Sequence, residues 1–162
     1  MDNNKLIKDW SIPAWDREKP AKCWNPDRQL LKSIRQYQRL KNSKNPLNRL
    51  RKKYCVIKHR FWSVVTGAEI DLSCQIGGGL LIPHPNGIVI HPGSTIGCNC
   101  IIFQQGTLAG PIELGYHVDI GAGAKIIGPL KIGNHVRIGA NAVVTHDVGE
   151  GETVVGIPAR SI

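Results

Sequence analysis

Aliphatic residues recur at every sixth position over much of the chain. From residue 90 onward, ten successive positions of this period are aliphatic: Ile90, Ile96, Ile102, Leu108, Leu114, Ile120, Ile126, Ile132, Ile138 and Val144. The position four residues after each of them is small or aliphatic, as at Ser94, Cys100 and Gly106. A period of six fits neither an α-helix nor an ordinary hairpin. It predicts short strands joined by tight turns and stacked into a solenoid around one continuous core.

The same period runs upstream, but two residues out of phase with the downstream positions. Its members are Ile70, Ile76, Ile82 and Ile88. The phase changes inside the stretch "PHPNGIVI", residues 83–90, and such irregularities often redirect a side chain near a functional site. His84 lies inside this break and is a candidate general base, because a neutral imidazole can accept a proton. His91 belongs to the resumed repeat and is expected to be structural, with a place in the lining of the acceptor pocket as the alternative.

The first third of the chain follows a helical pattern instead. Asn25-Pro26 and Asn45-Pro46 each place an N-cap residue before a proline at the first helical position. Two apolar faces with a period near 3.6 follow, which predicts two amphipathic helices. The apolar residues are Leu30, Leu31, Ile34, Tyr37 and Leu40 in the first helix, and Leu47, Leu50, Tyr54, Ile57, Phe61 and Val65 in the second. The preceding stretch "WSIPAWDREKPAKCW" predicts an extended arm pinned by burial of its tryptophans.

Charge divides the chain at the same place. Residues 1–65 carry 17 Lys/Arg against 5 Asp/Glu, whereas residues 66–162 carry 4 against 7, within a net charge of +9. We therefore assign residues 1–65 to an N-terminal arm with basic helices and residues 66–162 to the repeat. The favoured interpretation of the charge is a solvated face on helices that dock against something larger. Nucleic acid is not expected as a partner because no recognition motif accompanies the charge, while membrane contact by the basic helices stays open. The basic residues on these faces are Arg28, Lys32, Arg35, Arg39, Arg49, Arg51, Lys52, Lys53, Lys58 and Arg60.

The cysteines and the apolar runs indicate a location. No apolar run approaches the roughly 20 residues needed to cross a bilayer. The start "MDNNKLIKDW" lacks the apolar stretch of a signal peptide, which predicts a cytoplasmic protein with reduced thiols. The five cysteines are Cys23, Cys55, Cys74, Cys98 and Cys100. The C-x-C at 98–100 has no second ligand pair, so no metal site is expected.

Three strings of the repeat carry a family resemblance: "AEIDLSCQIGGGLLIPHPNGIVI", "IGAGAKIIGPLKIGNHVRIGANAVV" and the closing "VVGIPAR". Residues 68–162 resemble the hexapeptide-repeat acyltransferases, and within them the serine acetyltransferase branch. The resemblance implies a left-handed parallel β-helix, a homotrimer with active sites between subunits, and a place in cysteine biosynthesis. It also implies acetyl transfer from acetyl-CoA to a hydroxyl group, with no permanently bound cofactor.

The resemblance also assigns roles to single residues. The family base is a histidine in a "D-H-x-x-G-I-V" string, which His84 matches, and Glu69 falls where a carboxylate orients that histidine. Gly106 and Thr107 match the strand beside the thioester, where they are expected to help stabilise the oxyanion. The remaining positions match residues that hold acetyl-CoA: Ala122 and Ala140 through backbone amides, Thr145 and His146 where a Thr-Lys pair stands, and Arg160 where an arginine stands.

Two departures from the branch concern the acceptor. Pro83 replaces the aspartate that precedes the base, and "QQGTLAGPIELG" runs straight through the place of a loop with an Arg-His pair. A sugar or polysaccharide therefore stays open as an alternative to L-serine. A third alternative is a non-catalytic scaffold or a metal-binding hexapeptide protein resembling the carbonic-anhydrase-like members, which hold zinc with three histidines across subunits; His84, His91 and His117 are available, but their spacing does not resemble that signature. His117, His135 and His146 are otherwise expected to be solvated.

Overall fold

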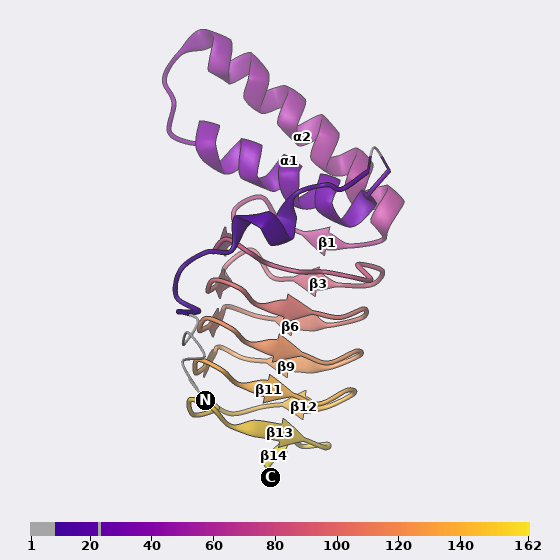
Figure 1. Cartoon of the computed structure of the whole chain (residues 1–162), viewed down its shortest axis with the longest axis vertical. Helices are drawn as coiled ribbons and strands as arrows, with labels where there is room; N and C mark the ends of the chain where they lie inside the picture. The colour runs from indigo at the N-terminus through magenta and orange to yellow at the C-terminus, as the bar shows by residue number, and fades with distance from the viewer. Residues whose placement is uncertain (1–8, 23) are drawn as a thin grey trace, which may run out of the picture.

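The chain is a column of stacked coils with two helices across one end (Figure 1). The computed structural model describes residues 9–22 and 24–162, so Cys23 of the expected arm lies outside the described residues. The helices occupy one end of the column and the C-terminus lies at the other, while the described part of the N-terminal arm runs from the helix end down one side of the coils.

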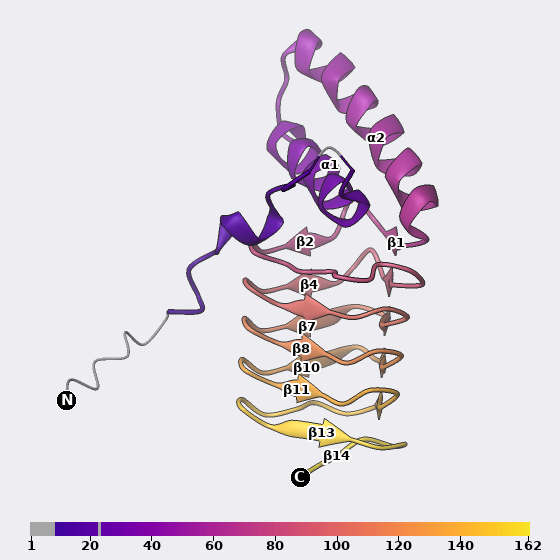
Figure 2. The same ribbon diagram turned by 45° about the vertical axis from the view of Figure 1, so that its right-hand side comes forward.

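Three parallel sheets form the walls of the column (Figure 2). Along the chain, each coil passes through sheet A, then sheet B, then sheet C, with a corner between successive sheets. Sheet A contains β1(Glu69–Ile70), β3(Val89–Ile90), β6(Thr107–Ala109), β9(Lys125–Ile127) and β12(Val143–Val144). Sheet B contains β2(Gln75–Ile76), β4(Thr95–Ile96), β7(Ile112–Leu114) and β10(Leu130–Ile132). Sheet C contains β5(Ile101–Ile102), β8(Asp119–Ile120), β11(Arg137–Ile138), β13(Thr153–Val155) and β14(Arg160–Ser161), of which β14 runs antiparallel to β13 and closes the column.

The core confirms the six-residue period. All ten aliphatic positions from Ile90 to Val144 are buried, and they stack on one another between coils. In sheet A, Ile90 pairs with Leu108, Leu108 with Ile126 and Ile126 with Val144. Each of these steps is 18 residues, because one coil contains three segments of six.

The register break is also confirmed, and the pairing places it more narrowly. Ile70 pairs with Ile90 and Leu81 with Ile101, so the coil at this level contains 20 residues instead of 18. The ordinary spacing has returned at Asn86, whose carbonyl accepts from the N–H of Gln105 (2.9 Å). The two extra residues therefore lie between Leu81 and Asn86, in the segment that carries His84.

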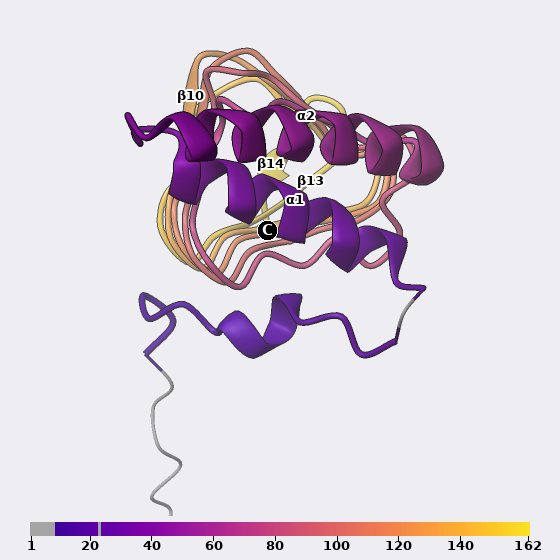
Figure 3. The same cartoon turned by 90° about the horizontal axis from the view of Figure 1, so that it is seen from above.

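Both predicted helices form, but only one uses its apolar face as expected. α1(Pro26–Leu40) buries Leu30, Leu31 and Ile34 over the open end of the coil, and α2(Pro46–Thr66) lies alongside it (Figure 3). α2 ends at Gly67, which adopts the left-handed conformation (φ +67°) that favours glycine. The predicted apolar face of α2 is exposed and does not pack on the rest of the described chain.

The arm is held largely by polar contacts, and the prediction that its tryptophans pin it by burial holds only for Trp10, which is partly buried and stacks on His117. Trp15, in the 3₁₀ helix η1(Trp15–Glu18), is 48% exposed, and Trp24 is 66% exposed. The Asn99 side chain is fully buried instead; it accepts from the N–H of Ala14 (2.9 Å) and donates to two carbonyls of the arm. Arg35, assigned from the sequence to a solvated face, is buried against Glu18 (Nη2–Oε1 2.7 Å).

Candidate active site

The corner between sheets C and A forms a column of small turns. We call residues 84–88, 104–106, 122–124 and 140–142 the C/A corner. Backbone hydrogen bonds join the turns of successive coils. The N–H of Gln105 donates to the carbonyl of Asn86 (2.9 Å), that of Gly123 to the carbonyl of Gln104 (2.9 Å) and that of Asn141 to the carbonyl of Ala122 (2.8 Å). The fold therefore aligns the segment of His84 with Ala122 and Ala140 along one edge of the column.

His84 is fixed through its backbone neighbours and open through its side chain. Ile88 N–H donates to the carbonyl of Pro85 (3.1 Å), and Gly87 N–H donates to the carbonyl of Gly67 at the end of α2 (2.8 Å). The imidazole is exposed and forms no hydrogen bond within the described residues. The inserted segment thus presents an imidazole at a rigid corner, where its nitrogen atoms face solvent or a ligand.

A backbone hydrogen bond joins Glu69 to the segment that carries His84. It is the first residue of β1, and its N–H donates to the carbonyl of Ile88 (2.8 Å). Its exposed side chain lines a cavity of about 420 Å³ at the junction of α2 and the first coils, together with His59, Ser63 and Asp71. Within the described residues no hydrogen bond joins Glu69 to His84, so the expected dyad remains a prediction.

His59 in this cavity was not anticipated from the sequence. It is nearly buried, its Nε2 has no hydrogen-bond partner in the described part of the chain, and burial lowers the pKa of its imidazole. Its place on the buried face of α2, four residues after Cys55 and seven before Thr66, could have indicated an inward position. No Lys or Arg lines the cavity, which leaves a bound carboxylate without a cation there.

The C/A corner offers unused backbone donors for an amide-rich ligand. In the described residues the N–H groups of Gln104, Ala122 and Ala140 donate to no acceptor. By contrast, the N–H of Gly106 donates to Phe103 (3.2 Å) and that of Thr107 to Ala124 (2.9 Å). The backbone N–H groups of Gly106 and Thr107 are therefore already engaged within the column, and the expected role of these two residues at the oxyanion stays a prediction.

A row of outward side chains on sheet A connects the candidate groups. Strand pairing aligns Glu69, Val89, Thr107 and Lys125 in that order. With strands about 4.8 Å apart, the Cα atom of Thr107 lies about 10 Å from that of Glu69. Lys125 was missed from the sequence; its ammonium donates to the carbonyl of Gln105 (2.6 Å) and places a cation beside Thr107. The six-residue register predicts this alignment once the strands are paired.

The remaining expected acetyl-CoA residues are divided between two edges. Thr145 and His146 are exposed and follow β12, at the corner between sheets A and B. Ala122 and Ala140 precede sheet A at the opposite corner. Arg160 is exposed on β14, next to β12 because Ala159 N–H donates to the carbonyl of Val143 (2.8 Å). One chain therefore does not bring Thr145 and His146 together with the C/A corner.

His91 and His117 lie at corners of the column other than that of His84. His91 accepts a hydrogen bond from Gly93 N–H (3.1 Å) at the A/B corner. His117 is not simply solvated, as expected, but stacks on Trp10 with ring centroids 3.6 Å apart, and its Nδ1 lies 2.8 Å from that of His135. Because His84, His91 and His117 stand at three different corners, they cannot surround one metal ion within a chain. In the described residues no group of three or more potential metal ligands is brought together.

The coils, their 18-residue spacing and their three parallel sheets define a hexapeptide-repeat β-helix protein. Within this class the chain is similar to serine acetyltransferases. It is 42% identical over 107 residues to the serine acetyltransferase of Synechococcus elongatus, which covers 61% of this chain and 44% of that protein. No protein-family model matches the chain.

Solved structures give the same result for the fold. A serine acetyltransferase in complex with CoA superimposes with a TM-score of 0.73 at 33% identity, over 86% of this chain and 57% of that one. The serine acetyltransferase of Neisseria gonorrhoeae in complex with serine gives 0.72 at 28% identity, over 86% and 57%. The predicted left-handed β-helix and the resemblance to this branch are thus confirmed. The chain spans about half the length of these relatives.

Proposed function

We propose that the chain is an acetyl-CoA-dependent O-acetyltransferase that transfers the acetyl group to the hydroxyl of L-serine. The observation that carries the proposal is His84, exposed in a two-residue insertion of a coil that resembles those of serine acetyltransferases. The imidazole stands on the same corner as the unused N–H groups of Ala122 and Ala140. Similarity to structures bound to CoA and to serine supports both substrates.

In the proposed reaction, His84 accepts the proton of the acceptor hydroxyl as its oxygen attacks the thioester carbonyl. The new C–O bond forms an oxyanion, and the C–S bond breaks when this intermediate collapses. The imidazolium returns the proton to the departing CoA sulfur, so that the ester and the free thiol are produced. Glu69 is proposed to orient His84 and stabilise its charged form. The Thr107 hydroxyl, which makes only a long hydrogen bond to the carbonyl of Gln105 (3.5 Å), is proposed to donate to the oxyanion in place of the engaged backbone N–H groups.

A homotrimer completes the acetyl-CoA site in this proposal. Ala122 and Ala140 lie at the C/A corner, whereas Thr145 and His146 lie at the A/B corner of the same chain. In the proposed trimer, the C/A corner of one copy would face the A/B corner of the next. The ligand would then contact the backbone amides of one subunit and Thr145 and His146 of the next, with Arg160 beside the CoA phosphates. The cytoplasmic location and the place in cysteine biosynthesis stay predictions.

A sugar or polysaccharide acceptor is the second candidate, and one observation favours it. The cavity lined by Glu69 contains the acidic Asp71 but no Lys or Arg, and Pro83 stands where serine-specific relatives have an acid. Carboxylates accept hydrogen bonds from sugar hydroxyls, whereas the carboxylate of L-serine would find no cation among these residues.

Release of thiol from acetyl-CoA tests both candidates. The assay compares L-serine, homoserine and a panel of sugars with a reaction that contains no acceptor. Release no faster with L-serine than with water alone would reject L-serine and leave the sugar as the acceptor class. Release with no acceptor of the panel would reject the proposed activity.

The variant His84→Ala tests the base. We expect turnover to fall by about 100-fold or more, since this is the usual contribution of a general base. His135→Ala is the matched control, because it removes an imidazole from another corner and should keep a rate close to that of the unaltered protein. A near-normal rate in His84→Ala would remove this residue from the mechanism.

A further inference from the structure

The outer face of α2 carries an uninterrupted apolar stripe. We use the name α2 stripe for Leu47, Leu50, Tyr54, Ile57, Phe61 and Val64. Their spacing alternates between three and four residues, so they lie along one face of the helix for about 26 Å. All six side chains are between 54% and 84% exposed, although α1 and the coil bury other faces of the same helix pair. Such a patch on a surface marks an interaction site.

Basic residues border the α2 stripe on both sides. At 100° per residue, Arg51 and Lys58 fall on one edge, and Lys53 and Arg60 on the other. The helix contains no Asp or Glu. Its buried residues, Cys55, His59 and Thr66, lie on a separate face. The helix therefore presents to the outside an apolar centre with cationic margins.

These margins disfavour a second copy of α2 as the occupant. In heptad terms the α2 stripe supplies the a and d positions, and the basic residues occupy the e and g positions. Pairing of two identical helices would bring Arg51, Lys53, Lys58 and Arg60 against like charges, which is repulsive. The occupant must instead combine an apolar layer with negative charge. Nucleic acid supplies the charge but gives large aliphatic side chains no apolar partner.

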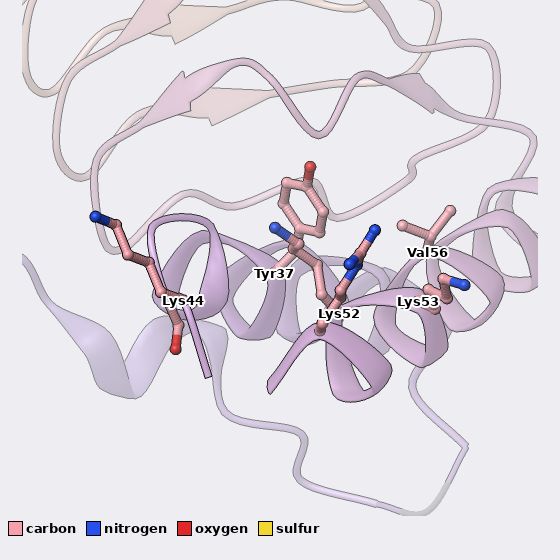
Figure 4. Close-up of a pocket in the computed structure, with 7 residues that line it drawn as sticks. Tyr37, Lys44, Lys52, Lys53 and Val56 are labelled. Atoms are coloured by element: carbon pink, nitrogen blue, oxygen red, sulfur yellow. The ribbon is translucent and has the colours of Figure 1, made fainter. Parts of the chain in front are cut away.

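Figure 4 shows a cationic cavity next to α2, on the side of the helix that carries Lys52 and Lys53. Its volume is about 480 Å³, and it lies between α1, the connecting loop and α2. Lys44, Arg49, Lys52 and Lys53 line it together with Tyr37, and no acidic residue does. Lys53 belongs both to this cavity and to the edge of the α2 stripe. An anionic headgroup in the cavity would thus be adjacent to acyl chains under the α2 stripe.

We propose that α2 docks the protein on an anionic lipid surface, with the α2 stripe among the acyl chains near the interface and the cationic cavity at headgroup level. This arrangement, an apolar face flanked by Lys and Arg, is that of helices that lie in the plane of a membrane. It does not require a membrane span, and no helix among the described residues has the length and apolar character for one. The proposal is independent of the acetyl-transfer activity.

Flotation with lipid vesicles tests the proposal on the full chain. Vesicles of phosphatidylcholine alone are compared with vesicles in which about a third of the lipid is phosphatidylglycerol. We expect binding to the anionic vesicles only, and weaker binding as NaCl rises from about 0.1 to about 0.5 M. Ile57→Glu should lower binding by about tenfold or more. Ile12→Glu is the matched control, because Ile12 is similarly exposed (63% against 67%) but lies on the arm.

A second pair of variants tests the cationic cavity without altering apolar surface. Lys53→Ala should weaken binding by about fivefold, while Lys131→Ala, at an exposed lysine of sheet B, should leave it unchanged. If the protein does not float with anionic vesicles, the proposal is overturned. Equal flotation of Ile57→Glu and Ile12→Glu would overturn it as well. Light scattering that shows a smaller oligomer for Ile57→Glu, with vesicle binding unaffected, would assign the α2 stripe to a second copy instead.

Discussion

Replacing Glu18 with glutamine should destabilise the protein more than any other single charge removal in the arm. Glu18 holds Arg35 through both carboxylate oxygens (2.7 and 2.9 Å). The same carboxylate accepts from the N–H groups of Gly79 (2.7 Å) and Leu80 (3.1 Å). Glu18 and Arg35 are both nearly buried. Glu18→Gln keeps the shape but leaves the guanidinium without its counter-charge.

The magnitude follows from what Arg35 retains. Breaking a buried pair by removing one partner costs about 3–5 kcal/mol. Arg35 still donates to the carbonyls of Ile76 and Gly77, so we expect the lower end, about 3 kcal/mol. In a chain of this size that corresponds to a melting temperature lower by about 6–12 °C. Thermal unfolding followed by circular dichroism measures the shift, with denaturant titration as the second measurement.

The neighbouring ion pair is the control. In the same arm, Lys19 Nζ lies 2.5 Å from Asp16 Oδ1, but the two side chains are 73% and 89% exposed. Asp16→Asn should leave the melting temperature unchanged, because solvent screens an exposed pair. If Glu18→Gln shifts melting as little as Asp16→Asn does, burial does not decide the strength of these pairs and the reasoning fails. The double variant Glu18→Leu with Arg35→Met should recover part of the loss, since it removes both buried charges.

Two further predictions concern turns and pH. Gly123→Ala should destabilise the fold more than Gly151→Ala in denaturant titration: both have positive φ (+73° and +75°), but an added Cβ meets a side-chain oxygen at 2.1 Å only at Gly123. Burial lowers the pKa of His117 from its ordinary value of 6.5, so the folded chain favours the neutral imidazole. The stabilisation of the fold by His117 is therefore fully present above pH 6.5 and is lost as the pH falls through the lowered pKa of the folded state. Acidification should therefore release Trp10 from His117, which tryptophan fluorescence detects. His135→Ala should reduce this pH response, because it removes the imidazole that contacts His117. A fluorescence signal unchanged between pH 7.5 and about 5 would contradict the prediction.

The coil could be predicted from the sequence because its geometry repeats in the chain itself. A coil of three six-residue segments places an aliphatic residue inward once per segment, so Ile90 and its successors reveal both the strands and their pairing. The locking of the arm could not be predicted. Glu18, Arg35 and Asn99 are far apart in the sequence, and charged or polar residues of these types usually lie on the surface. Only the folded chain brings them together.

The candidate site was predictable to a similar extent. The phase shift located His84, and the repeat placed Ala122 and Ala140 at equivalent turns. Engagement of the Gly106 and Thr107 amides could not be foreseen, because it depends on which N–H group points along the column at each turn.

The end of α2 connects the two proposals physically. Its last turn stops at Gly67, whose carbonyl accepts from Gly87 N–H (2.8 Å), and a Cβ at Gly67 would lie 2.8 Å from the side chain of Asn86. Asn86 and Gly87 directly follow the inserted segment that carries His84. The helix proposed to lie on lipid therefore ends on the coil that carries the proposed base, while Arg160 lies at the far end of the column (Figure 1). Docking through α2 would hold His84 near the surface and leave the CoA phosphates directed away from anionic lipid.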